Sequence, residues 1–151
     1  MTPSTALLND LVKIVDKFVR KVKKDRKASP LKDVRAALST KDYYTQHGSL
    51  TIGLPRRNGN TTLALKLLKK YPKSIYIACT RAMCCEAAKR YGVKENRFFS
   101  ANMNDIRLVM PDHTEIVITE ALSWASESAI SRMYQSLDRY HPIYIHLGTT
   151  K

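Results

Sequence analysis

The chain has 151 residues, of which 44% are hydrophobic and 26% are charged. This length and composition exclude a chain that is disordered throughout, and they indicate one globular domain with a real core. Twenty-six Lys and Arg residues against 13 Asp and Glu residues give a formal net charge of +13, which favours a polyanionic partner, with nucleic acid first and nucleotide phosphates second.

The sequence gives little support for a membrane protein or for a metal site. No apolar run approaches the roughly 18 residues of a membrane span, and the first residues lack a secretory pattern. The three cysteines, Cys79, Cys84 and Cys85, match no metal-ligand spacing and are interpreted as reduced thiols. We therefore expect a cytoplasmic protein that makes no contact with a membrane.

Residues 1–40 are predicted to form a basic helical segment that packs on a core formed by residues 41–151. Its first part, residues 1–27, predicts a long helix, because apolar residues recur at the i, i+3, i+4 spacing of one helix face. A second short helix is predicted from Ser29 to about Leu38. The apolar stripe either packs on the chain's own core or forms a homo-oligomer.

Basic residues lie mostly on the other faces of this first helix. They either follow a phosphate backbone or form a solvated face above a packed stripe, and the two roles are compatible. The candidates for nucleic-acid contact are Lys13, Lys17, Arg20, Lys21 and Lys24.

A strand, a polar loop and a helix start are predicted between residues 49 and 71. Residues 40–48 are predicted to be a loop leading into a strand at residues 50–52. The following loop is rich in Gly, Pro, Arg and Asn, and a helix begins at Thr62. This order of elements binds phosphate, because the first N–H groups and the dipole of the helix point at the anion.

The loop matches the standard phosphate-loop pattern G-x-x-x-x-G-K-[ST] only in part. Gly59 matches the second glycine, and Thr61 matches the hydroxyl that would hold Mg²⁺. Leu54 stands in place of the first glycine and Asn60 in place of the lysine. The motif is recognisable but deviant.

The rest of the chain alternates between strand-like and helix-like runs. Strands are predicted at 74–79, 115–121 and 143–147 and, more weakly, at 97–99 and 106–110, with helices at 82–91 and 123–140. Such alternation predicts an α/β fold with a parallel sheet and helices on both faces. The loop at 54–61, Thr80-Arg81, Thr119-Glu120 and 148–150 would then meet at one sheet edge.

Four of these segments resemble motifs of one family. Residues 54–62 resemble the deviant phosphate loop of the large terminase subunits of tailed phages. Residues 76–81 resemble motif Ia of terminases and superfamily-two helicases, and residues 116–121 resemble their Walker B motif. Residues 147–150 are similar to motif III, which couples hydrolysis to motion. Order and spacing agree over roughly residues 46–150.

The resemblance implies a three-layer, RecA-like P-loop NTPase core that binds ATP and Mg²⁺. It also implies that the protein comes from a phage or another virus of bacteria and is located in the host cytoplasm. It implies a role for Glu120 in orienting the attacking water and for Arg56 or Arg57 in replacing the missing lysine. Arg81 joins the nucleic-acid contacts, and Thr149 and Thr150 become coupling residues. Gln46, with Tyr43 or Tyr44, would contact the adenine. The remaining nucleotide-binding residues would be Asn58, Gly59, Asn60, Thr61 (also the metal ligand) and Thr62.

Two departures from the family pattern bear on activity. Asn60 replaces the phosphate-neutralising lysine, and Thr119 replaces the aspartate that would position Mg²⁺. We therefore expect a degenerate P-loop NTPase-like protein with weak or no hydrolysis. Its partner would be nucleic acid, with DNA favoured over RNA, or an acidic nucleoprotein in a viral assembly. The alternative is an active ATP- and Mg²⁺-dependent ATPase acting on DNA. A third reading, a nucleotide kinase, lacks an identifiable acceptor site and lid.

Overall fold

Five parallel strands form the centre of the structure, a computed structural model that describes residues 5–28, 37–53, 60–78, 89, 92, 97–100, 114–120 and 125–148. The elements are α1 (Thr5–Ala28), α3 (Thr40–His47), β1 (Ser49–Gly53), α4 (Asn60–Lys70), β2 (Ser74–Ala78), β3 (Phe98–Ser100), β4 (Ile116–Glu120), α6 (Glu127–Leu137), the 3₁₀ helix η4 (Asp138–Tyr140) and β5 (Ile143–Gly148). The predicted α/β class and parallel sheet are confirmed.

The strand order in the sheet is β1-β5-β4-β2-β3. In the register of the sheet, Gly53 of β1 pairs with Gly148 of β5, and Glu120 of β4 pairs with Ala78 on one side and Leu147 on the other. The carboxyl ends of β1, β5, β4 and β2 therefore lie at the same edge. This is the edge at which ligands bind in open parallel sheets.

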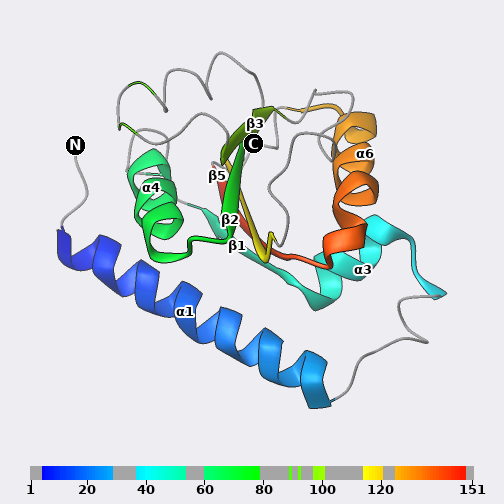
Figure 1. The fold of residues 1–151 in the computed structure, drawn as a ribbon, viewed down its shortest axis with the longest axis horizontal. Coiled ribbons are helices and arrows are strands. Elements are labelled where there is room, and N and C mark those ends of the chain that lie inside the picture. Colours follow the sequence, from blue (N-terminus) through cyan, green and yellow to red (C-terminus); the bar gives the residue numbers. More distant parts are fainter. Residues whose placement is uncertain are drawn as a thin grey trace.

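Helices cover both faces of the sheet (Figure 1). The connection from β1 through α4 to β2 crosses the sheet in one direction, and the connection from β4 through α6 to β5 crosses it in the other. Right-handed crossovers then place α4 and α6 on opposite faces. Side chains alternate accordingly: Ile116 and Ile118 of β4 pack toward α1 and α4, whereas Val117 packs toward α3 and α6.

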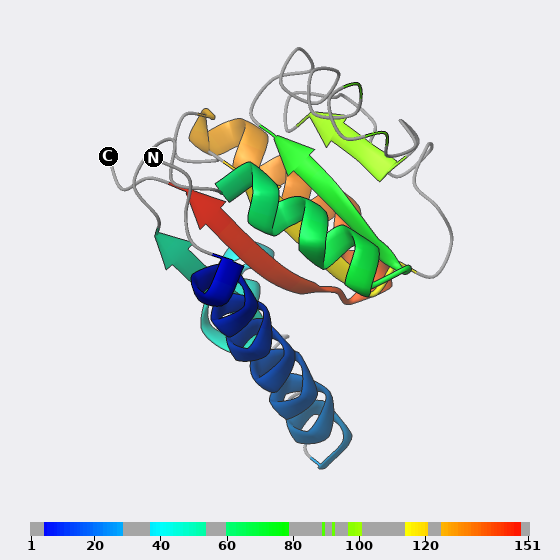
Figure 2. The same ribbon diagram turned by 90° about the vertical axis from the view of Figure 1, so that its left-hand side faces the viewer.

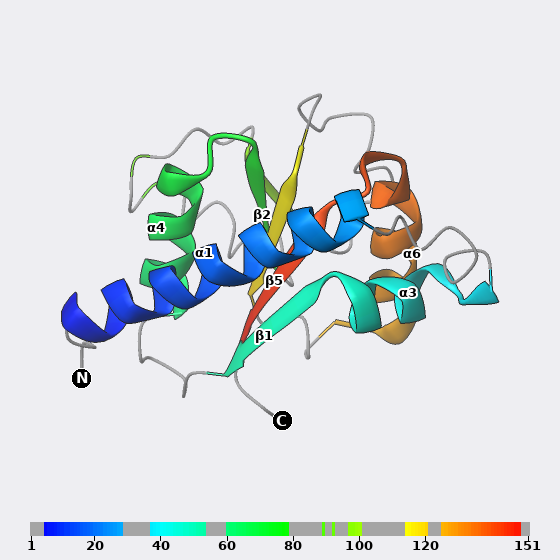
Figure 3. The ribbon, with the colours of Figure 1, turned by 90° about the horizontal axis from the view of Figure 1, so that it is seen from below.

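Helix α1 lies across the same face as α4, beside it and over the β1–β5 side of the sheet (Figures 2 and 3). Its stripe of Leu8, Val15, Val19 and Val22 is buried in one cluster with α4 and the strands. Near its end, the guanidinium of Arg26 donates to the backbone carbonyls of His141 and Pro142, at 2.7 and 3.1 Å. Hydrophobic burial and a long-range polar clamp thus hold α1 on the sheet.

The prediction of a loop at residues 40–48 is wrong, because α3 occupies Thr40–His47. The hydroxyl of Ser39 accepts a hydrogen bond from the N–H of Asp42 and caps the helix. Burial of Tyr43 and Tyr44 against α6 and β5 then offsets the weak helical pattern of this polar sequence. The predicted helices at 29–38 and 82–91 and the predicted strand at 106–110 fall largely or wholly outside the described residues.

One half-buried arginine holds the end of α4 against the strands. The guanidinium of Arg97, which precedes β3, donates to the carbonyls of Leu68 and Tyr71 at 2.7 and 3.1 Å. It also donates to the carbonyl and the hydroxyl of Ser74, at 3.0 and 2.9 Å. These acceptors include carbonyls that the end of a helix leaves without internal partners, so Arg97 acts as a cap supplied from a distant segment.

We expect Arg97→Met to lower the free energy of unfolding by about 2–4 kcal/mol, because it leaves several shielded acceptors without a donor. The matched control is Arg132→Met, since Arg132 is exposed on α6 and its loss should cost less than about 0.5 kcal/mol. Urea denaturation followed by circular dichroism measures both values. Equal losses in the two variants would contradict the capping role.

Candidate functional site

The carboxyl edge of the sheet is where most of the predicted nucleotide-site residues were expected. Asn60, Thr61 and Thr62 form the first turn of α4, and the side chain of Thr62 is half-buried. Because α4 returns antiparallel to the strands, its N-terminus lies at this edge and directs free N–H groups there. The remaining predicted residues of the edge lie outside the described ranges: Arg56, Arg57, Asn58, Gly59, Arg81, Thr149 and Thr150.

Glu120 ends β4 at this edge, and its carboxylate is held from within the protein. The residue is 8% exposed, and the hydroxyl of Tyr76 on the neighbouring strand β2 donates to one of its carboxylate oxygens. Both side chains lie on the face covered by α4. The ring of Tyr76 packs against Phe98, with 5.3 Å between centroids. Tyr76 therefore fixes the orientation of the one predicted catalytic acid.

Thr119, one residue earlier, points to the opposite face and is fully buried. Its hydroxyl lies 2.7 Å from Nδ1 of His146, the residue opposite it on β5. Nε2 of the same ring lies 2.8 Å from the hydroxyl of Tyr134 on α6. Burial lowers the pKa of His146 to about 4, so the ring is neutral at pH 7, with one nitrogen donating and the other accepting.

The hydrogen-bonded chain of Thr119, His146 and Tyr134 determines what Thr119 can contribute to Mg²⁺ binding. The sequence resemblance expects an acid there that positions Mg²⁺ through water. A buried hydroxyl paired with a neutral imidazole supplies no charge and is turned away from the α4 face. In the described ranges, no three His, Cys, Asp or Glu side chains are grouped as metal ligands.

Gln46 does not lie with the residues at the carboxyl edge. It is exposed on α3, which ends at the amino end of β1, roughly 16 Å of strand away from Gly53 at 3.3 Å per residue. Tyr43 and Tyr44 are buried, and their hydroxyls bond to Nε2 of His141 and to Oδ1 of Asp138, at 3.0 and 2.7 Å. The predicted adenine contact stays a prediction, and these three residues lie away from the carboxyl edge.

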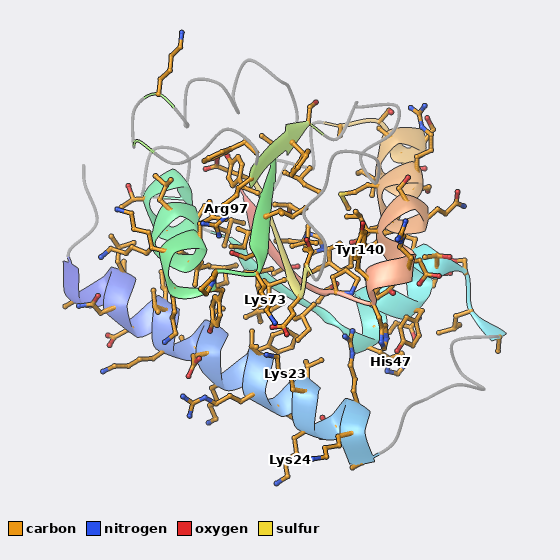
Figure 4. The ribbon with its side chains drawn as sticks, in the orientation of Figure 1. Lys23, Lys24, His47, Lys73, Arg97 and Tyr140 are labelled. Carbon is orange, nitrogen blue, oxygen red and sulfur yellow. The ribbon has the colours of Figure 1, made fainter. Side chains whose placement is uncertain are left out.

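The basic residues of α1 form a second candidate site on the outside of the molecule. The five predicted nucleic-acid contacts of α1 are exposed and follow the i, i+4, i+7, i+8, i+11 spacing of one helix face: Lys13, Lys17, Arg20, Lys21 and Lys24. At 100° per residue this face is opposite the buried stripe. Figure 4 shows Lys24 pointing away from the core. We call these five residues the α1 basic stripe.

Sequence reasoning missed two acids that organise the surface beside the α1 basic stripe. Asp16 lies 2.9 Å from Arg20 and 3.7 Å from Lys70, and it accepts a hydrogen bond from the hydroxyl of Tyr71. Glu115 lies 3.3 Å from Lys23 and 3.8 Å from Lys73. The only local signal is the i, i+4 spacing of Asp16 and Arg20, because the other partners are far apart in sequence.

Comparison of the chain with protein-family models, with curated proteins and with solved structures finds no match. In the described ranges, no helix combines the length and the hydropathy that a membrane crossing requires.

The lowered pKa of the half-buried His146 should make stability depend on pH. Above its unfolded-state pKa of roughly 6.5 the ring is neutral in both states. Between that value and the folded-state pKa of about 4, only the unfolded chain takes up the proton. The free energy of unfolding should then fall by up to about 1.4 kcal/mol per pH unit as the pH decreases.

Urea denaturation between pH 7 and 4.5 measures this dependence. His146→Gln should flatten it, whereas His47→Gln on α3 should leave it in place. A profile that is the same in His146→Gln and in the unmodified protein would show that His146 is not buried as a neutral ring.

Proposed function

We propose that this chain is a P-loop NTPase-like protein that binds nucleic acid through the α1 basic stripe, with weak or no nucleotide hydrolysis. The observation that carries the proposal is the exposure of these cations along one face of a helix whose opposite face is buried in the core. A rigid row of cations binds a phosphate backbone and releases its counterions, without reading sequence. DNA is favoured over RNA, and an acidic nucleoprotein of a viral assembly is the alternative partner.

The sheet supports the P-loop-like part of the proposal. The strand that precedes the phosphate-loop-like segment leads to the N-terminus of α4, and the Walker B-like and motif III-like segments end on β4 and β5 at the same edge. ATP phosphates fit this edge, because the first turn of α4 offers N–H groups and a favourable dipole. A three-layer, RecA-like architecture of phage type is the finer proposal.

The residues at the end of β4 are less suited to bind Mg²⁺ than the first turn of α4 is to bind phosphate. Thr119 is buried and paired with a neutral histidine, so Glu120 alone supplies an anionic oxygen from this strand. Phosphoryl transfer depends on cations and acids placed around the γ-phosphate, and losing them typically removes several kcal/mol of transition-state stabilisation. This geometry supports weak or no hydrolysis.

An active DNA-dependent ATPase is the second candidate, and one observation favours it. Glu120 is almost fully buried at the carboxyl edge and is oriented by Tyr76. A carboxylate held in this way is suited to orient an attacking water. In that case Glu120 would be the catalytic residue and Tyr76 its positioning residue.

Neutralising two cations of the α1 basic stripe should weaken nucleic-acid binding. We expect Lys17→Gln/Lys21→Gln to lower the affinity for duplex DNA about tenfold or more at about 0.1 M salt. The slope of log K against log salt should decrease by about 1.8, since each lost phosphate contact removes about 0.9. Fluorescence anisotropy with a labelled duplex over a salt series measures both quantities.

The matched control is Arg132→Gln/Arg139→Gln, which removes the same charge from exposed residues of α6 and η4 on the opposite face of the sheet. It should leave the slope unchanged. Equal losses in the two double variants would assign the effect to net charge and would remove the α1 basic stripe as the binding site.

Nucleotide chemistry is tested by calorimetry with ATP and Mg²⁺ beside a hydrolysis assay with and without duplex DNA. The proposal expects weak binding and no DNA-stimulated turnover. Turnover that is stimulated by DNA and abolished in Glu120→Gln would establish the ATPase instead.

A further inference from the structure

Two acidic side chains connect α1 to a second group of cations. Asp16 is shared by Arg20 of α1 and Lys70 of α4, and Glu115 is shared by Lys23 of α1 and Lys73. Figure 4 shows Lys23 and Lys73 near each other between α1 and the sheet. Each carboxylate balances only one of its two cations, so positive charge remains on both sides. The resulting composite surface consists of Arg20, Lys23, Lys70 and Lys73.

The two carboxylates differ in how firmly they are held. The side chain of Asp16 is 20% exposed, and the hydroxyl of Tyr71 donates to it at 2.9 Å. This hydrogen bond, followed by Lys70 and Arg20, lowers the pKa of Asp16 although burial acts in the other direction. Asp16 is therefore part of the packing between α1 and α4.

Glu115 is held only loosely by comparison. Its side chain is 46% exposed, and those of Lys23 and Lys73 are 53% and 61% exposed. Exposed ion pairs of this kind contribute little net free energy. The backbone of Glu115 is fixed independently, through hydrogen bonds with Lys73 and Ile143. Its carboxylate can thus exchange for another anion without disturbing the sheet.

We propose that the backbone of duplex nucleic acid lies across the composite surface, with phosphates replacing the carboxylate of Glu115 as the partner of Lys23 and Lys73. This inference rests on the proposed nucleic-acid function and extends it from α1 to the end of α4 and the turn before β2. Glu115 is then an internal counterion that limits the affinity of the surface.

The side chains of the surface favour a duplex over a single strand. Single-strand sites combine a cationic groove with aromatic rings on which bases stack. Here Tyr71 is half-buried and its hydroxyl bonds to Asp16. The groups that reach solvent are lysine and arginine cations from two separate elements, which suit two rows of phosphates rather than base faces.

The test is the affinity of Glu115→Gln for a labelled 20-base-pair DNA duplex, measured by fluorescence anisotropy over a salt series. Removing the competing carboxylate should raise the affinity about three- to tenfold at about 0.1 M salt. The matched control is Glu127→Gln, the same substitution at an exposed site of α6 on the other face, which should change the affinity less than about 1.5-fold. The gain should disappear when Glu115→Gln is combined with Lys23→Gln/Lys73→Gln.

The other possible outcomes would contradict part or all of the proposal. Equal effects of Glu115→Gln and Glu127→Gln, with duplex binding still dependent on Lys17 and Lys21, would overturn the composite surface and leave the proposed function standing. Absence of duplex binding in the unmodified protein would overturn both. Tighter binding of a single strand than of the duplex, or displacement of the duplex by polyglutamate at equal charge concentration, would overturn the duplex assignment.

Discussion

A parallel sheet has two apolar faces, and the need to cover both determines the rest of this molecule. Helix α4 covers the β2–β4 part of one face, and the β1–β5 part of that face is left to α1. The stripe of α1 is buried for this reason. Its polar face is then fixed in direction, so the placement of the surface cations follows from the packing of the core.

Charge is distributed unevenly between the two ends of the sheet. At the carboxyl edge, Thr119, His146 and Tyr134 form a neutral chain, and Glu120 is bound by Tyr76. At the amino edge, cations from α1, α4 and the turn before β2 surround two acids. Among the described residues, an anion therefore meets a helix dipole and backbone N–H groups at the carboxyl edge and lysine and arginine cations at the amino edge, and the second attraction depends much more strongly on salt.

Elements built from strong local patterns were predictable from the sequence. The run Ile116–Ile118 reads as a buried strand, and the alternation of strands and helices gives a parallel sheet. α3 was missed because Tyr43 and Tyr44 become helical through tertiary burial, which overrides a weak local pattern.

The pairings of side chains at the two candidate sites could not be predicted in the same way. Thr119 contacts His146 only because β5 pairs with β4 in one particular register. The local periodicity of the sequence does not determine the order or the register of the strands. Glu115 and Lys23 are 92 residues apart, so only the folded sheet brings them together. The α1 basic stripe, in contrast, was visible because its spacing is local.

The clamp formed by Arg26 has a consequence for how the chain reaches its native state. Its acceptors, the carbonyls of His141 and Pro142, lie 115 and 116 residues further along. During synthesis at ~5–20 residues per second, α1 leaves the ribosome several seconds before the strand that it must join. Throughout that interval its apolar stripe can contact α4 but not β5, the other element on which it is buried. The docking of α1 is therefore completed only when the last strand is available, and contacts of such high sequence separation favour slow folding.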